Sequence, residues 1–157
     1  MIFQRITGPA TPEKVFIVVK NTYSTASLTN GQAAMWDYVT DIDGVGVTKP
    51  AAITVSGGLA AAGIVAETIA AGAYGLVQVY GLHTAALCRA TTGGSITMTH
   101  GSPLALGLEA SFALAPIVTS YASTALIKRY FPCAFAMARY TTRNVTGTAK
   151  AVFIKAL

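Results

Sequence analysis

Short apolar runs, each closed by glycine, proline, asparagine or aspartate, follow one another along the chain. The clearest run is KVFIVVKN, residues 14–21, whose β-branched and aromatic side chains favour a strand. In GLVQVYG, residues 75–81, Leu76 and Gln78 fall on one face of a strand and the valines beside them on the other. This pattern of short strands between close turns is typical of an all-β protein.

The remaining segments continue the pattern. Residues 33–44 predict a strand that runs into a turn ending at Gly44. Residues 60–72 are ambiguous, because their alanines allow a helix, but Gly63 and the β-branched residues around it favour a strand. Further strands are expected within residues 51–58, 83–90, 95–100, 103–114, 125–131, 133–140 and 147–157.

Two of these segments carry more detailed expectations. In CAFAMARY, residues 133–140, alternation places Phe135, Met137 and Arg139 on one face, opposite small side chains. KAVFIKAL, residues 150–157, alternates less clearly and is expected to be buried on both faces. About eight to ten short strands predict a single all-β domain over residues 1–157: a β-sandwich, a jelly-roll-like fold or a small β-barrel.

The composition is strongly apolar, with 53% hydrophobic and 11% charged residues, whereas soluble domains have about 25% charged residues. A membrane-spanning helix is not expected, because the longest apolar runs, around 59–71 and 104–115, are each interrupted by a glutamate and a glycine. We therefore expect a folded surface that is rich in small apolar side chains and becomes an interface within an assembly.

The net charge of +5 is unevenly placed: residues 1–78 carry four basic and five acidic side chains, residues 79–157 seven basic and one acidic. Basic and aromatic residues alternate in the late segment LIKRYFPCAFAMARYTTR, residues 126–143. A surface of this kind can bind single-stranded nucleic acid, because its aromatic side chains stack on the bases and its basic side chains attract the phosphates. Binding of a protein partner, or plain solvation of the charges, is the favoured interpretation.

His83 and Cys88 raise the question of a nucleophile pair or a metal site. On a strand, a separation of five residues points their side chains to opposite faces. His100 and Cys133 are isolated and lack zinc-ligand spacing. We expect a buried Cys88 and a His83 at the surface or in a turn. The two cysteines fit free buried thiols, with one disulfide between them as the alternative.

Other candidate motifs are incomplete. Asp37, Asp41 and Asp43 resemble part of a calcium loop but lack its later ligands, so an Asx-type turn at Asp43-Gly44 is expected instead. The glycine pairs fit neither a phosphate-binding loop nor a dinucleotide fingerprint, and turns with positive φ account for them better. We therefore expect no cofactor, no metal and no enzymatic activity.

Three stretches together resemble a known family: AAGAYGLVQVYGLHTAALC, TTGGSITMTHGSPLALG, and CAFAMARYTTRNVTGTAKAVFIKAL at the end. They are similar to capsid decoration (cement) proteins of tailed bacteriophages. The first stretch carries a hairpin signature of that family, here Gly72, Tyr74, Gly75, Val77, Gln78 and Gly81. A turn at Gly101, Pro103 and Leu104 and a terminal strand from Gly147 to Ile154 follow. The resemblance covers roughly residues 63–157.

The resemblance implies a structural virion protein that is made in the host cytoplasm and sits on the outer face of an HK97-type shell. It would clamp neighbouring major capsid subunits against the pressure of packaged DNA, most naturally as a homo-oligomer, without membrane or nucleic acid. The alternatives are another virion β-protein (coat, head-fibre or tail component) and a nucleic-acid-binding β-barrel that uses residues 128–143.

Two segments are expected to contact a partner. One is an extended N-terminal arm, residues 1–14, with Phe3 and Arg5, which orders along a neighbour on assembly or forms a simple edge strand. The other is the late basic segment, with Lys128, Arg129, Tyr130, Arg139 and Arg143.

Overall fold

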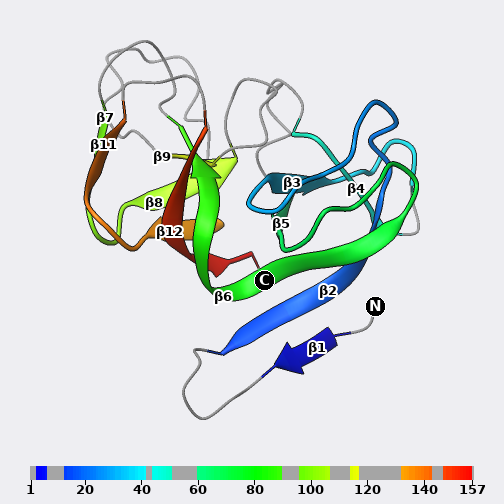
Figure 1. The fold of residues 1–157 in the computed structure, drawn as a ribbon, viewed down its shortest axis with the longest axis horizontal. Helices are drawn as coiled ribbons and strands as arrows, with labels where there is room; N and C mark the ends of the chain where they lie inside the picture. Colours follow the sequence, from blue (N-terminus) through cyan, green and yellow to red (C-terminus); the bar gives the residue numbers. More distant parts are fainter. Residues whose placement is uncertain are drawn as a thin grey trace.

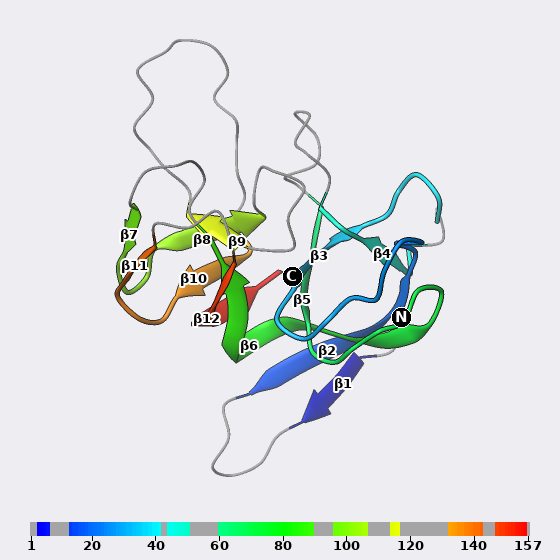
Figure 2. The same ribbon diagram turned by 45° about the horizontal axis from the view of Figure 1, so that its top comes forward.

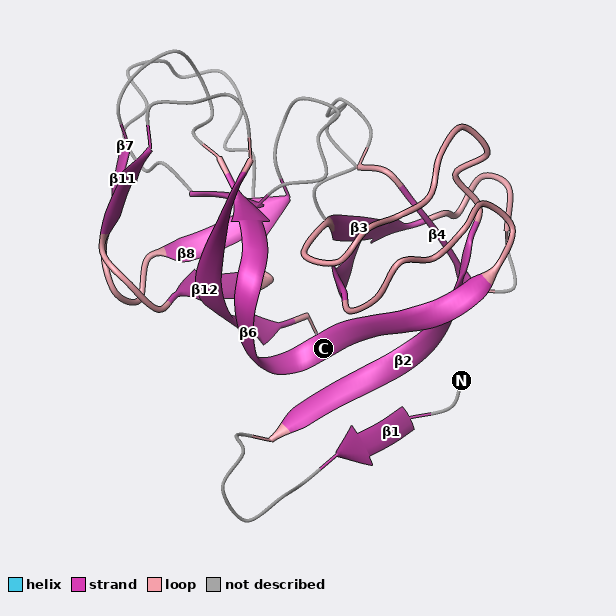
Figure 3. Ribbon diagram, viewed as in Figure 1, coloured by secondary structure: helices cyan, strands magenta, loops and turns pink. Residues whose placement is uncertain are grey.

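Strands and loops build the part of the chain that this computed structural model describes, and that part contains no helix (Figure 3). The structure describes residues 3–6, 13–41, 44–50, 60–89, 96–106, 114–116, 132–142 and 147–156. The strands are β1 (Phe3–Ile6), β2 (Lys14–Asn21), β3 (Ala33–Trp36), β4 (Gly46–Thr48), β5 (Ala61–Val65), β6 (Tyr74–Cys88), β7 (Ile96–Met98), β8 (Pro103–Leu106), β9 (Leu114–Pro116), β10 (Ala134–Ala136), β11 (Tyr140–Thr142) and β12 (Thr148–Lys155). The predicted all-β class is confirmed.

Five strands close into a first ring, here called the N-terminal ring. β2 pairs in parallel with β4, and antiparallel pairs continue from β4 through β3 and β5 to the first half of β6. The ring closes because β6 also pairs with β2, from Val15 opposite Tyr80 to Lys20 opposite Tyr74. These strands enclose one cluster of buried apolar side chains: Ile17, Val19, Leu28, Ala34, Val47, Ala62, Val65, Ile69, Val77 and Val79.

A second group of five strands closes the C-terminal ring. β12 pairs with the second half of β6, and antiparallel pairs continue through β10 and β8 to β9. Leu114 of β9 then pairs in parallel with Cys88 of β6 and closes the ring. Most of the second buried cluster comes from this ring, but Ala33 and Ile64 of the N-terminal ring belong to it as well, so the two cores abut.

The long strand β6 is shared by both rings and runs from one to the other (Figures 1 and 2). It turns between them at Gly81, whose φ is +100°. A Cβ atom there would lie 2.1 Å from the carbonyl oxygen of Glu13, so the close approach of the two backbones requires glycine. The buried Gln78 side chain supports the bend by donating hydrogen bonds to the carbonyls of Tyr80 (3.0 Å) and Leu82 (3.2 Å).

β1 lies at one end of the strand order and, among the described residues, pairs with β2 alone. Phe3 is opposite Ile17 and Ile6 is opposite Lys14, so β1 covers the part of β2 that β4 does not reach. Residues 3–6 therefore form a simple edge strand, which is the expected alternative to an arm that orders along a neighbour. At the other side of the molecule, β7 and β11 form a separate two-stranded sheet.

Several predicted strands are found with their predicted character. β2 spans the predicted residues 14–21, and β3 runs into the predicted turn after Trp36. The ambiguous segment 60–72 forms a strand, although only as far as Val65; Ile69 then makes a single bridge to Leu28. The strands predicted at 51–58 and 125–131 lie outside the described residues.

Three details of the prediction are wrong. The strands predicted at 75–81 and 83–90 are not separate: residues 74–88 form one continuous strand, because Gly81 bends β6 instead of ending it. The run 133–140 is broken after Ala136, so Phe135, Met137 and Arg139 do not share one strand face. β12 alternates between buried and more exposed positions and is covered on one face only, because it lines a ring.

Candidate functional site

The glycine-rich signature at the start of β6 has a structural role. Gly72 occupies a tight turn with φ +75°, in which the Ala73 amide bonds the Ala70 carbonyl at 3.0 Å. Gly75 packs against Ile69, whose Cγ1 would lie 2.6 Å from an added Cβ. Gln78 and Gly81 shape the bend described above, whereas the Tyr74 side chain is 65% exposed.

Three large apolar side chains stand exposed at one end of the N-terminal ring: Tyr38 (64%), Val39 (90%) and Tyr74 (65%). We call them the apolar rim. The pairing places them at that end, because Tyr74 lies opposite Lys20 on β2 and the Lys20 amide bonds the Val45 carbonyl. The amide of Asp37, just before Tyr38, bonds the neighbouring Gly46 carbonyl at 3.0 Å.

Asp37 holds the turn that carries Tyr38 and Val39. Its Oδ1 accepts hydrogen bonds from the amides of Val39 (3.1 Å) and Thr40 (3.0 Å), and its Oδ2 accepts the hydroxyls of Thr22 (2.6 Å) and Thr40. Burial acts to raise the pKa of Asp37, but the hydrogen bonds outweigh it and lower the pKa to about 2. This Asx-type turn stands six residues before the predicted one, whose Asp43 lies outside the described residues.

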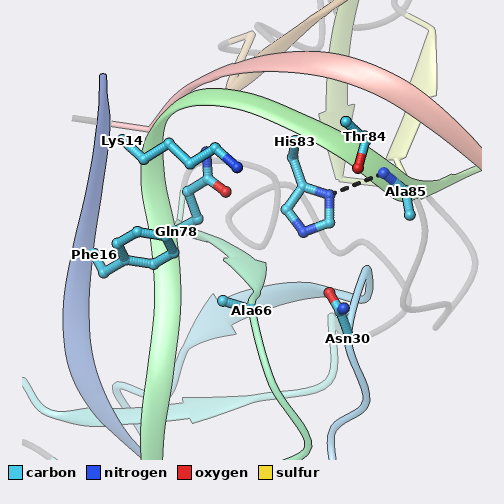
Figure 4. Close-up of a pocket in the computed structure, with 8 residues that line it drawn as sticks. All are labelled: Lys14, Phe16, Asn30, Ala66, Gln78, His83, Thr84 and Ala85. Atoms are coloured by element: carbon cyan, nitrogen blue, oxygen red, sulfur yellow. Dashed lines mark hydrogen bonds between the residues drawn. The ribbon is translucent and has the colours of Figure 1, made fainter. Parts of the chain in front are cut away.

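A polar pocket of about 200 Å³ lies at the junction of the two rings, beside the bend of β6. Figure 4 shows Gln78 on the part of β6 before the bend and His83 on the part after it, with Lys14 reaching in from β2. The lining residues are Lys14, Phe16, Asn30, Ala66, Gln78, His83, Thr84 and Ala85. This pocket was not predicted from the sequence. A glutamine followed five residues later by a histidine, in an otherwise apolar strand, is the sequence feature that could have indicated it.

His83 is only 7% exposed, so the predicted surface or turn position is wrong. The Ala85 amide donates a hydrogen bond to His83 Nδ1 at 3.2 Å (Figure 4). Burial, and secondly the charge of Lys14, lower the pKa of His83 below 6.5. The imidazole is therefore neutral at pH 7 and carries its proton on Nε2, since Nδ1 is the acceptor.

The predicted partner-binding residues are not gathered into one site by the described structure. Arg139 is exposed between β10 and β11. For Phe3 and Arg5 the structure describes the backbone of β1 alone. Lys128, Arg129, Tyr130 and Arg143 lie outside the described residues.

Neither cysteine forms a disulfide, both are buried, as expected for Cys88, and both belong to the second apolar cluster. Burial raises the pKa of Cys133 to about 12, and its thiol donates to the Leu104 carbonyl at 3.7 Å. Within the described ranges, no group of three or more His, Cys, Asp or Glu side chains is placed to hold a metal ion. The same ranges contain no helix that is long and apolar enough to cross a membrane.

No family model matches the sequence, and no curated protein matches it.

Proposed function

We propose that this protein is a structural virion protein: a capsid decoration protein that binds the outer face of a phage head and clamps neighbouring major capsid subunits. The observation that carries the proposal is the apolar rim of Tyr38, Val39 and Tyr74, exposed at one end of a closed ring. Tyrosine is enriched among the residues that dominate the energy of protein interfaces. A rim held by the Asp37 turn contacts a rigid shell without losing much conformational entropy.

The arrangement of the three family-like stretches also supports the proposal. Their strands β6, β8 and β12 come from residues 70–88, 91–107 and 133–157, and all three contribute to the C-terminal ring, which shares β6 with the N-terminal ring. That ring and its two-stranded extension would form the body of the protein, and the N-terminal ring would present the rim to the shell. Many copies of one modest contact, repeated over a shell, add up to a large stabilisation.

Cosedimentation of the purified protein with heads of the phage that encodes it tests both the role and the rim. We expect the wild-type protein to sediment with heads at a copy number comparable to that of the major capsid protein. The variant Y38S/Y74S should bind at least tenfold more weakly, because a tyrosine at the centre of an interface contributes about 2 kcal/mol or more. Its own fold should be unaffected, since both side chains are exposed.

Met137→Ser is the matched control, because Met137 is an exposed apolar residue (44%) of the C-terminal half. This variant should bind heads like the wild type. If M137S loses binding and Y38S/Y74S keeps it, the contact lies elsewhere and the assignment of the rim is wrong. If the wild-type protein does not bind heads at all, the proposed function is wrong.

A further inference from the structure

The pocket at the bend of β6 contains buried polar groups with unused hydrogen-bonding capacity. His83, 7% exposed, has its Nδ1 occupied by the Ala85 amide, and its Nε2–H edge is directed toward the side of the pocket lined by Asn30 and Ala66 (Figure 4). Gln78, 2% exposed, uses its amide nitrogen for two backbone carbonyls. Buried polar groups in native proteins nearly always have a partner, which is protein, water or a ligand, so the free donor of His83 is available to a molecule bound in the pocket.

The charge in the pocket comes from Lys14, which is half-buried at the start of β2. Within the described part of the chain, no acidic side chain lines the pocket, and the Lys14 charge opposes protonation of His83. An anion bound between the two would balance the Lys14 charge. It would also give the ammonium group a charge-assisted hydrogen bond.

We propose that this pocket binds a carboxylate group. One permanent positive charge matches a monoanion, and the Nε2–H of His83 and the amide of Asn30 are donors for its two oxygens. A dianionic phosphate would bring a second charge that no described lining residue compensates. The carboxylate is either that of a small free acid or the side chain of an Asp or Glu on a partner protein. The proposal stands independently of the capsid role.

The test follows the imidazole signals of the full-length protein by NMR during titration with sodium acetate at constant ionic strength. The chain contains two histidines, and His100, exposed in the turn before β8, is an internal control. Acetate should shift the His83 signals in a saturable way and leave those of His100 unchanged. Equal shifts at both histidines, no shift at His83, or the same response to phosphate or chloride would overturn the proposal.

A second titration, with the capped peptide acetyl-Gly-Glu-Gly-amide, distinguishes a small free acid from an acidic side chain of a partner protein. Saturable binding of this peptide, but not of its glutamine counterpart, assigns the pocket to an acidic side chain of a protein. Binding of acetate without the peptide assigns it to a small free carboxylate. Either result supports a carboxylate site, whereas equal binding of the glutamine peptide contradicts it.

Lys14→Met keeps the length of the side chain and removes its charge, and Lys20→Met is the matched control. Lys20 points to the same face of the same strand, about 20 Å away at the usual rise per residue. We expect K14M to bind acetate about tenfold more weakly and K20M to bind it like the wild type. Equal affinities of K14M and the wild type, with both variants folded by their amide spectra, would overturn the proposal.

Discussion

Replacing Gly81 by alanine tests the bend that joins the two rings. Two effects add at this position. The backbone has φ +100°, a conformation that costs a residue with a Cβ about 1–2 kcal/mol. The new Cβ would also lie 2.1 Å from the Glu13 carbonyl oxygen and 3.2 Å from the Lys14 Cα. Forcing backbone apart in a packed site costs about 1–3 kcal/mol more, so G81A should lose about 2–5 kcal/mol of stability.

Gly72→Ala separates the two effects. Gly72 also has a positive φ, +75°, but nothing lies within 4 Å of its added Cβ. G72A should therefore lose only the backbone term of about 1–2 kcal/mol.

Urea unfolding followed by the fluorescence of Trp36, the single tryptophan, which packs against the N-terminal core, measures both variants. With a slope of about 2 kcal/mol/M, the midpoint of G81A should fall by about 1–2.5 M. Equal losses in G81A and G72A would refute the close approach of Glu13 to β6.

Three further predictions concern buried groups. Because the pKa of Asp37 is lowered in the folded protein, its carboxylate stabilises the fold fully above pH 4, and this effect is lost as the pH falls through about 2. The free energy of unfolding of the wild type, measured with urea, should therefore drop by about 1–2 kcal/mol between pH 4 and pH 2. Asp37→Asn should lose about that much at pH 7 and show no such drop; a parallel drop would contradict the assignment. Gln78→Met, which removes the side-chain donor from two carbonyls at the bend, should lose about 1–3 kcal/mol in the same assay, and an unchanged midpoint would contradict its role. Cys88 and Cys133 should be inert to a thiol reagent in the native protein, and both should react in urea; rapid native reaction of Cys133 would contradict its burial.

The local pattern of apolar and turn residues predicts which segments form strands, but not how these strands pair and close into two rings. β2 could be predicted because five consecutive residues, 15–19, are β-branched or aromatic, and the turn at Gly72 because glycine adopts its positive φ. The prediction divides β6 at Gly81, because glycine weakens the interior of a strand, but glycine also marks a tight bend where another backbone approaches closely, as Glu13 does here. The two rings depend on pairings between distant segments, such as Cys88 with Leu114, which periodicity does not encode.

The candidate site was predictable to a smaller extent. Alternation separated His83 from Cys88 and argued against a metal or nucleophile pair, but it did not predict that His83 is buried. Its burial results from the bend, which brings Lys14 and Asn30 to the same pocket. The exposure of Tyr38 and Tyr74 also depends on where the ring ends in space, because tyrosine is intermediate in burial and its hydrophobicity alone does not decide its position.

The stabilisation of a phage head that we propose for this protein can be measured directly. Heads assembled without it should be heated in a calorimeter before and after addition of the purified protein. We expect saturating protein to raise the temperature of head disruption, Y38S/Y74S to do so only at much higher concentration, and M137S to act like the wild type. An unchanged disruption temperature with the wild-type protein bound to the heads would contradict the claim.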